Sequence, residues 1–271
     1  MEPWYQACRT VAGRLERALA DLAPAERRRE IGAGEGGDTT VVVDELAEDL
    51  VFAELERLHQ AGERFTVVSE ERGEVDFGGD GVRVVVDPID GSLNAKRGLP
   101  AFSLSVAVAD GPTLEDVVFG FVHDFGWGEE WVATRGKGAS RDGERLDPAA
   151  GEHRCDDGRL EILAVESADP RWVAASLDGL LDSAHRLRAF GSIALSLVQV
   201  AAARVDGMVS LRNARSFDVA AAQLVVREAG GHVSFPRCDG PLDCPLDLEP
   251  RSPVVAARTP ESLARLTGIP T

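Results

Sequence analysis

The sequence has few positive charges, and this scarcity argues against several classes of partner. Its 271 residues include 29 Lys and Arg against 46 Asp and Glu, which gives a formal net charge of −17. Nucleic acids and anionic membrane surfaces both reward clustered basic residues. We therefore expect no nucleic-acid partner and no membrane partner.

Lysine is almost absent. Lys96 and Lys137 are the only two lysines, and the other 27 basic residues are arginine. An acidic, lysine-poor surface suggests work in concentrated salt, where charges are screened within about 3 Å at 1 M. A GC-rich genome would also favour arginine. We expect both causes to contribute and predict a halophilic protein.

Long apolar runs and zinc-type cysteine pairs are also absent. No stretch approaches the ~20 apolar residues of a membrane span, and we find no apolar signal core at the N-terminus. The four cysteines lack the spacing of zinc ligands; they are Cys8, Cys155, Cys238 and Cys244. These absences predict a cytoplasmic protein with free thiols in a reducing compartment.

The apolar pattern predicts alternating helices and strands. Helical spacing indicates helices at residues 3–29, 44–61, 170–181, 193–204, 219–229 and 259–266, with a glycine-rich break at 31–37. Short β-branched or apolar runs indicate strands at 66–69, 82–86, 102–109, 117–122, 130–133, 160–165, 186–190, 208–211 and 254–257. A polar stretch near 149–159 suggests a boundary. We therefore expect an N-terminal α+β domain, 1–152, that carries the site, and a C-terminal α/β domain, 153–271, that completes it.

Two acids follow the valine run at 84–86. The sequence there is Asp87-Pro88-Ile89-Asp90-Gly91-Ser92, which we interpret as a turn. Two carboxylates about 4 Å apart repel by roughly 4 kcal/mol at an effective dielectric constant of 20. A divalent cation between them would remove that repulsion, and oxygen ligands suit magnesium, manganese or calcium. Taken alone, the spacing fits a plain turn equally well.

The residues after Asp90 can bind an anion. Gly91-Ser92-Leu93-Asn94 can open a helical turn whose unpaired backbone N–H groups attract phosphate. Carboxylates beside an anion-binding turn indicate a metal-mediated phosphoryl-transfer site. Glu70-Glu71 and Asp218 add acids elsewhere in the chain, although each alone fits an exposed loop or a helix N-terminus.

These motifs together resemble the inositol monophosphatase family, which includes fructose-1,6-bisphosphatases and phosphoadenosine-phosphate phosphatases. The residues 87–94 match its metal-binding signature, and Ser69-Glu70-Glu71 matches its Gly-Glu-Glu element. Phe217-Asp218-Val219-Ala220-Ala221 matches a second signature, with Phe for the usual Trp, and Gly191-Ser192-Ile193 resembles a family turn. The resemblance runs from about residue 10 to the C-terminus.

The resemblance implies a fold, a cofactor and a set of residue roles. The fold is a five-layer α-β-α-β-α sandwich, in the α+β class, usually as a homodimer. Two or three Mg²⁺ ions, with Mn²⁺ as a substitute, would be held by Glu70, Asp87, the Ile89 carbonyl, Asp90 and Asp218. Substrate would be bound by Asp90, Gly91, Ser92, Gly191 and Ser192, with the backbone amides of Gly91 and Ser92 on its phosphate. Glu70, Ser92 and Asp44 would orient or activate the attacking water, and we expect in-line attack on phosphorus without a phosphoenzyme.

The substrate is less clearly indicated. Where animal-type inositol phosphatases carry an acid for the ring hydroxyls, this chain has Leu211, followed by Arg212 and Arg215. Arginine pairs well with phosphate, so we hypothesise that fructose 1,6-bisphosphate is hydrolysed, alongside or instead of inositol 1-phosphate. Surface arginines are an equal alternative. A 3′-phosphoadenosine 5′-phosphate phosphatase and a metal-binding regulatory protein of the same fold are the competing functions.

Overall fold

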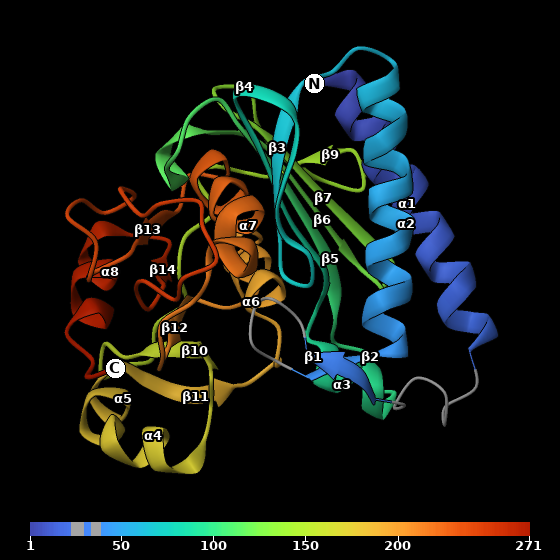
Figure 1. The fold of residues 1–271 in the computed structure, drawn as a ribbon. Coiled ribbons are helices and arrows are strands. Elements are labelled where there is room, and N and C mark those ends of the chain that lie inside the picture. Colours follow the sequence, from blue (N-terminus) through green and yellow to red (C-terminus); the bar gives the residue numbers. More distant parts are fainter. Residues whose placement is uncertain (23–29, 34–38) are drawn as a thin grey trace.

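The computed structural model describes residues 1–22, 30–33 and 39–271. In this part of the chain two β-sheets are separated by helices and flanked by helices, so that helix and sheet layers alternate (Figure 1). In sequence order the helices are α1 (Glu2–Asp21), α2 (Val42–Gln60), α3 (Ser92–Arg97), the 3₁₀ helix η1 (Leu114–Asp116), α4 (Pro170–Ala175), α5 (Leu177–Ser183), α6 (Ile193–Ala201), α7 (Ser216–Glu228) and α8 (Pro260–Thr267).

The first sheet has seven named strands in the order β3-β4-β5-β6-β7-β8-β9. They are β3 (Phe65–Ser69), β4 (Gly73–Asp90), β5 (Ser103–Ala109), β6 (Val117–Asp124), β7 (Glu129–Thr134), β8 (Gly138–Arg141) and β9 (Glu144–Arg145). The long element β4 passes β3 twice: Val67 lies opposite both Val75 and Val84. From β4 to β9 the neighbouring strands are antiparallel.

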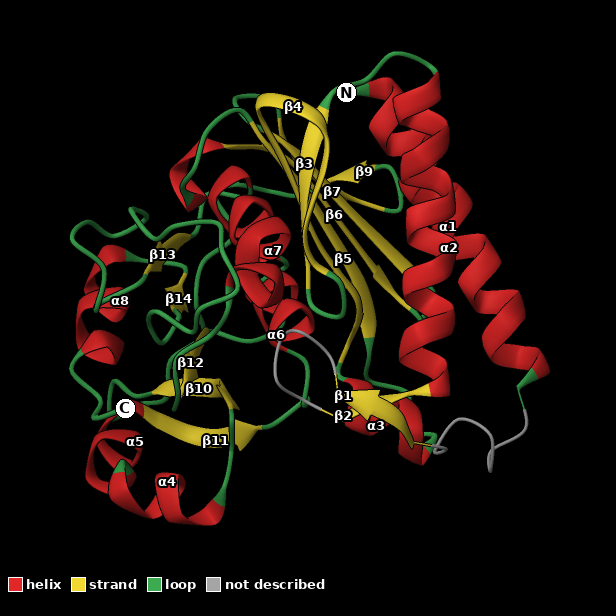
Figure 2. Cartoon of the chain, in the orientation of Figure 1, coloured by secondary structure: helices red, strands yellow, loops and turns green. Residues whose placement is uncertain are grey.

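The second sheet has five strands in the order β11-β10-β12-β14-β13. They are β10 (Leu160–Glu166), β11 (Ala184–Arg188), β12 (Gly207–Ser210), β13 (His232–Ser234) and β14 (Val255–Ala257). The strand β10 is parallel to both of its neighbours, β11 and β12, whereas β14 is antiparallel to β12 and β13. A separate antiparallel pair, β1 (Glu30–Ala33) and β2 (Thr39–Val41), directly precedes α2 (Figure 2).

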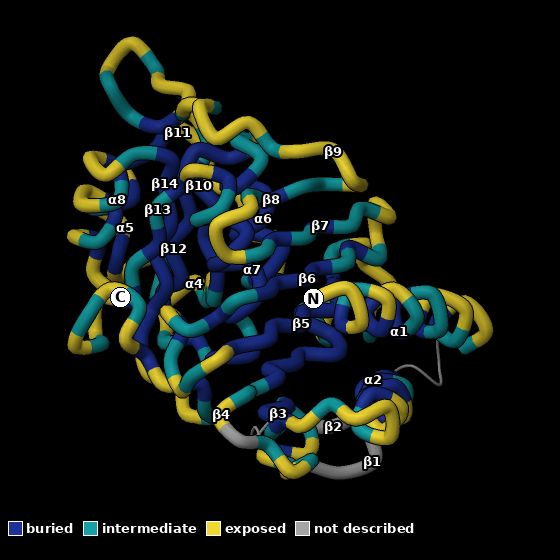
Figure 3. Tube along the Cα trace, turned by 90° about the horizontal axis from the view of Figure 1, so that it is seen from above, coloured by how far each residue is buried: buried dark blue, intermediate teal, exposed yellow. Residues whose placement is uncertain are grey.

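Three buried clusters hold the five layers together. The first places α1 and α2 against the outer face of the seven-stranded sheet through Leu15, Val51 and neighbouring side chains. The central cluster joins both sheets to α6 and α7, and the third packs α5 and α8 on the far face of the second sheet. The strands at the centre are accordingly the most buried part of the trace in Figure 3. The observed order is therefore the α-β-α-β-α sandwich of the α+β class that the resemblance implied.

The central helix α7 lies directly on the first sheet because a glycine permits the contact. A Cβ atom added to Gly120 of β6 would lie 2.5 Å from the carbonyl oxygen of Ala221 on α7. Since real Cβ atoms essentially never approach so closely, any side chain here would push α7 away from the strand. Gly120 thereby sets the spacing of the layer that carries Asp218.

Most of the expected elements are present, with four differences. The helix expected at 170–181 is two helices, α4 and α5, which meet at Ser176; its hydroxyl bonds the Trp172 carbonyl at 3.0 Å and the Pro270 carbonyl at 2.6 Å. The first helix ends at Asp21, and the remainder of its expected range, 23–29, lies outside the described residues. The glycine-rich break at 31–37 begins inside β1, and its residues 34–37 also lie outside them. The elements that were not expected are β1, β2, β8, β9, β13, the 3₁₀ helix η1 and the first part of β4, from Gly73.

The cysteines require a correction. We expected four free thiols, but Cys238 and Cys244 form a disulfide across a Cα–Cα distance of 5.5 Å, while Cys8 and Cys155 are free. The six-residue separation was compared only with zinc-ligand spacings, whereas the chain folds back between the two cysteines and brings them into disulfide range. No helix in the described ranges is both long and apolar enough to cross a membrane.

Candidate metal centre

The two acids at the end of β4 are presented by a β-bulge rather than by the expected turn. Asp87 pairs with Ser105 of β5 and Asp90 with Ser103, so β4 takes three steps where β5 takes two. In a regular strand residues three apart point to opposite faces. The extra residue, at Pro88-Ile89, returns Asp90 to the same face as Asp87, because Ser103 and Ser105 share a face.

Asp218 joins these two acids from the first turn of α7. One carboxylate oxygen from each of Asp87, Asp90 and Asp218 lies within 4.8 Å of the others. Asp87 and Asp90 are 2% and 7% exposed, and Asp218 is half-buried. Three of the five predicted metal ligands thus meet, although they come from positions up to 131 residues apart in the sequence.

The pKa values of Asp87 and Asp90 are raised in this crowded, buried group. Burial and the charges of Glu70, Asp90 and Asp218 hold the pKa of Asp87 well above its usual range, although its Oδ1 accepts a bond from the Ile89 N–H at 2.9 Å. Burial raises the pKa of Asp90 to about 6, against hydrogen bonds that favour its ionised form. A divalent cation would relieve this repulsion and displace the protons.

Glu70 reaches the cluster through Arg215. Arg215 Nη1 lies 3.4 Å from Glu70 Oε1, and the Arg215 backbone N–H donates to Asp218 Oδ2 at 2.7 Å. Arg215 therefore touches two predicted metal ligands, one with its side chain and one with its backbone. The predicted phosphate contact from Arg215 would require the guanidinium to share or leave Glu70.

Asp90 is held from the second half of the chain. Its Oδ2 accepts bonds from the Ser192 hydroxyl at 2.5 Å and from the Ala194 N–H at 2.7 Å. The Ser192 hydroxyl also accepts from the Leu195 N–H at 3.1 Å, which caps α6. The predicted residue Ser192 thus contacts the cluster, and Gly191 precedes it in the same turn.

The segment after Asp90 begins α3 with a glycine in the left-handed region. Gly91 has φ = +94°, and a Cβ there would lie 2.9 Å from the Ala101 carbonyl oxygen. Asn94 fixes the first turn, since its Nδ2 donates to the Ala101 and Phe190 carbonyls at 2.6 and 2.7 Å. Ser92, half-buried, is the first helical residue, two positions from Asp90.

The third predicted catalytic residue, Asp44, lies in the first turn of α2 and is 5% exposed. Its Oδ2 is 3.7 Å from Lys96 Nζ on α3, so it is joined to the segment that carries Ser92. One turn further along α2, Glu48 accepts a hydrogen bond from the Ser69 hydroxyl at 2.6 Å, immediately before Glu70. Burial raises the pKa of Glu48 to about 7.

Arg212 lies against a different partner. It is exposed, and its guanidinium stacks 4.3 Å from the ring centre of Trp172 on α4. The structure thus separates the contacts of the two candidate substrate arginines: Arg215 lies on the acids and Arg212 on an aromatic ring.

Sequence reasoning missed Glu166 and Glu48. Glu166 ends β10, is 2% exposed, and accepts bonds from the Phe190 and Gly191 N–H groups and the Ser196 hydroxyl. An acid directly after the apolar run 160–165 repeats the pattern that identified Asp87, so this signal was present in the sequence. Glu48 lies four residues after Asp44 on one helix face, which is a weaker signal.

The donor set fits Mg²⁺ or Mn²⁺. The converging side-chain atoms are carboxylate oxygens, with no thiol or imidazole in the group, and hard divalent cations prefer oxygen ligands. Pro88 and Ile89 fall between the paired positions of β4 and β5, at the point where the Ile89 carbonyl was predicted to bind metal.

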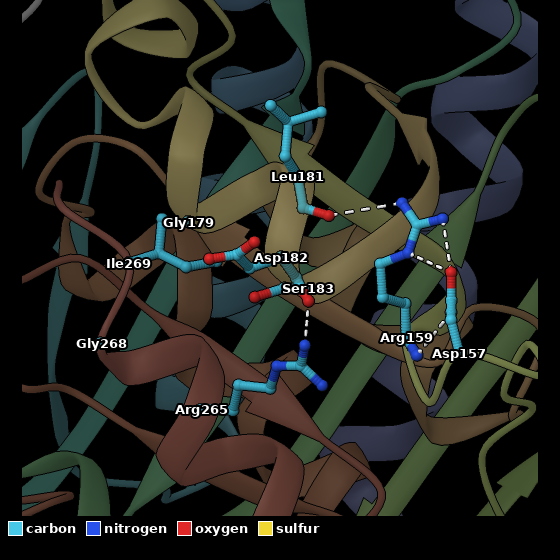
Figure 4. Close-up of a pocket in the computed structure, with 9 residues that line it drawn as sticks. All are labelled: Asp157, Arg159, Gly179, Leu181, Asp182, Ser183, Arg265, Gly268 and Ile269. Carbon is cyan, nitrogen blue, oxygen red and sulfur yellow. Dashed lines mark hydrogen bonds and ion pairs between the residues drawn. The ribbon is translucent and has the colours of Figure 1, made fainter.

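A pocket of about 670 Å³ lies elsewhere in the molecule. It lies between α5, α8 and the 157–159 loop, and Figure 4 shows Arg159 and Arg265 at its wall. Arg159 bonds Asp157 Oδ2 at 2.8 Å and the Leu181 carbonyl at 3.3 Å, while Arg265 bonds the Gly158 carbonyl at 3.4 Å. None of the predicted site residues is among the described residues that line this pocket.

The chain is similar to known proteins over most of its length. The model of the inositol monophosphatase family matches residues 1–268. A fructose-1,6-bisphosphatase/inositol-1-monophosphatase of Methanothermobacter thermautotrophicus is 35% identical over 266 residues, covering 94% of this chain and 91% of its own. The Nus factor SuhB of Escherichia coli is 34% identical over 200 residues, 73% of this chain and 72% of its own.

Solved structures share the fold. The SuhB protein of Bartonella henselae superposes with a TM-score of 0.77 at 27% identity and covers 99% of this chain and 98% of its own. The MJ0109 gene product, an inositol monophosphatase–fructose 1,6-bisphosphatase, gives a TM-score of 0.82 at 23% identity, with 97% and 98% covered. The chain therefore belongs to the inositol monophosphatase family and is a phosphoric monoester hydrolase.

Proposed function

We propose that the protein is a Mg²⁺-dependent phosphatase for a small sugar or cyclitol phosphate. The observation that carries this proposal is the convergence of Asp87, Asp90 and Asp218 at the start of α3 and α7. Glu70, Asp87, the Ile89 carbonyl, Asp90 and Asp218 would hold the cations. When bound, these ions would neutralise the acids, polarise the phosphate and lower the pKa of the attacking water.

The remaining chemistry is assigned to the chain's own groups. The backbone N–H groups of Gly91 and Ser92 would hold the phosphate, with Ser192 and the Gly191 turn closing the site on the side of the second sheet. Glu70 would accept the proton of the attacking water, and the Ser92 hydroxyl would orient that water with Asp44. In this arrangement water attacks phosphorus in line with the leaving oxygen, and no side chain is phosphorylated.

For the substrate we propose fructose 1,6-bisphosphate, with inositol 1-phosphate as a second substrate. Two relatives named for both activities, from Methanothermobacter and Thermococcus, are 35% and 36% identical to this chain. Arg212 and Arg215 would contact the second phosphate. Replacing both with Ala should then raise KM for the bisphosphate about tenfold and leave KM for inositol 1-phosphate nearly unchanged.

The test is a phosphate-release assay with fructose 1,6-bisphosphate, inositol 1-phosphate and 3′-phosphoadenosine 5′-phosphate. It should be run with Mg²⁺, with Mn²⁺ and with EDTA, at low and high salt. We expect release from the first two substrates, and its loss in EDTA. Release from phosphoadenosine phosphate alone would favour the nucleotide phosphatase. Equal KM changes for fructose 1,6-bisphosphate and inositol 1-phosphate would remove the arginines from the second-phosphate site.

A second candidate is a metal-binding regulatory protein of the same fold, which the similarity to chains named Nus factor SuhB favours. Absence of phosphate release from every substrate, together with retained Mn²⁺ binding, would support it. The homodimer, the cytoplasmic location, the high-salt adaptation and the division at 152/153 stay predictions. Sedimentation in solution would test the first of these.

A further inference from the structure

The strand end of β10 carries a buried acid for which the proposed chemistry has no direct use. Glu166 accepts the Phe190 N–H at 2.9 Å and the Ser196 hydroxyl at 2.5 Å with Oε1, and the Gly191 N–H at 3.0 Å with Oε2. Its own carbonyl oxygen accepts the Leu211 N–H at 3.0 Å, which ties it to the end of β12. Each side-chain oxygen of this acid is therefore bonded, and the acid is rigidly placed in the second sheet.

The turn that Glu166 holds is the turn that holds Asp90. Residues 190 and 191 bond to Glu166, and the next residues supply the Ser192 hydroxyl and the Ala194 N–H to Asp90 Oδ2. The Phe190 carbonyl accepts Asn94 Nδ2 at 2.7 Å, so the same turn also contacts α3. With Oδ2 held by two donors, the Asp90 carboxylate cannot rotate freely.

We infer that Glu166 is a positioning residue for the metal centre, acting on Asp90 through the 190–194 turn. The inference rests on the proposed function, because it assumes that Asp90 binds a cation. Ser192 and Ala194 are the direct outer partners of Asp90, and losing such a partner typically weakens metal binding 10–100-fold even though the ligand itself remains. Glu166 acts one bond further out, on the turn that places both partners. Glu166 would therefore control cation affinity from the opposite sheet without touching the cation.

The variant Glu166→Gln tests this inference. It keeps the shape but replaces one acceptor oxygen with an NH₂ group that faces existing donors. We expect Mn²⁺ affinity, measured by isothermal titration, to fall at least tenfold. The Mg²⁺ concentration for half-maximal phosphate release should rise in parallel, while KM for substrate at saturating Mg²⁺ changes less than threefold. Glu161→Gln, an exposed acid on the same strand, is the matched control and should bind Mn²⁺ like the wild type.

A merely structural role gives a different result. In that case Glu166→Gln lowers the melting temperature but leaves Mn²⁺ affinity within twofold of the control, which overturns the inference. If Glu166→Gln does not fold, Ser196→Ala removes only one of the three bonds and should weaken Mn²⁺ binding by about threefold; unchanged binding overturns the inference equally. The double variant Glu166→Gln/Ser192→Ala should lose less Mn²⁺-binding free energy than the sum of the two single losses, because both residues act on Asp90 through the same turn.

Failure of the proposed function can be distinguished from failure of the inference about Glu166. If wild-type protein binds no Mn²⁺ and releases no phosphate, the metal centre itself is wrong. If the wild type does both and Glu166→Gln matches Glu161→Gln, only the role of Glu166 is wrong.

Discussion

At the scale of single residues, Asp90 is the acid of β4 that the second half of the chain holds in place. It shares a face with Asp87 because of the bulge, and it is bonded to Ser192 and Ala194 from the other half of the chain. The variant Asp90→Asn removes a charge but keeps the volume. We expect kcat to fall at least 100-fold and Mn²⁺ affinity to fall, because a neutral amide is a poorer ligand and its NH₂ group meets donors.

Phosphate release would measure kcat of the variant, and circular dichroism would measure whether it keeps its fold. Asp110→Asn, at an exposed position just after β5, is the control and should keep normal turnover. Near-normal turnover of Asp90→Asn would contradict the assignment of the metal centre.

Glu48 predicts a pH-dependent stability. Burial raises its folded-state pKa from 4.5 to about 7, so the folded protein retains a proton that the unfolded chain releases. This contribution is complete below about pH 4.5 and is lost as pH rises through 7. Glu48→Gln has no proton to lose, so its stability relative to the wild type should increase between pH 5 and 8, by up to about 3 kcal/mol.

Urea unfolding at several pH values, in EDTA, would measure this difference. Glu45→Gln, exposed on the same helix, is the control and should follow the wild type. A constant difference between Glu48→Gln and the wild type across the range would show that Glu48 is ionised in the folded protein.

Single residues also show the limit of sequence reasoning. Asp87, Asp90 and Asp218 could be found because their patterns combine, although none of these patterns is decisive alone. The bulge could not be found, because Asp-Pro-Ile-Asp reads equally well as a turn, and only the pairing with Ser103 and Ser105 distinguishes the two. The bonds of Glu166 depend on a turn 24 residues away, which no local spacing reveals.

At the scale of elements, the disulfide predicts a local stabilisation. Cys238 and Cys244 close a short loop whose far end pairs with the β5–β6 connection: the Leu114 N–H donates to the Cys244 carbonyl at 2.9 Å. Closing a loop of this length stabilises the fold by about 2 kcal/mol through the unfolded chain. Cys238→Ser should therefore lower the melting temperature under oxidising conditions.

Differential scanning calorimetry with and without a reductant would test the contribution of the disulfide to the melting temperature. Reduction should lower the wild-type melting temperature to that of Cys238→Ser and should not change the variant further. Cys155→Ser, which removes a free thiol, should behave like the wild type in both conditions. An unchanged melting temperature on reduction would mean that the bond contributes little.

Element type was predictable where the apolar period was strong, as in α1, α6, β5 and β10. Element type was not predictable for β8, β9 and β13. These strands are only two to four residues long and are stabilised by pairing with neighbouring strands. Helices α4 and α5 were joined in the prediction because a single residue, Ser176, lies between them.

At the scale of the whole molecule, net charge predicts a response to salt. A charge of −17 on one domain-sized chain repels itself, and salt shortens the range of that repulsion from about 10 Å at 0.1 M to 3 Å at 1 M. We expect the melting temperature to rise with KCl, mostly below about 0.5 M. Choline chloride at equal ionic strength should act alike, because screening depends on ionic strength. A melting temperature that falls with salt would mean that attractive ion pairs dominate.

The bulge at Pro88-Ile89 has a consequence for how this strand can vary. A shorter Asp-X-Asp strand would also present both acids on one face, because residues two apart point the same way. The extra residue is needed only because three residue steps separate the two acids, and it leaves Pro88 and Ile89 opposite a single residue of β5. Deleting one of these two residues would keep both acids on one face and would restore one-to-one pairing with β5.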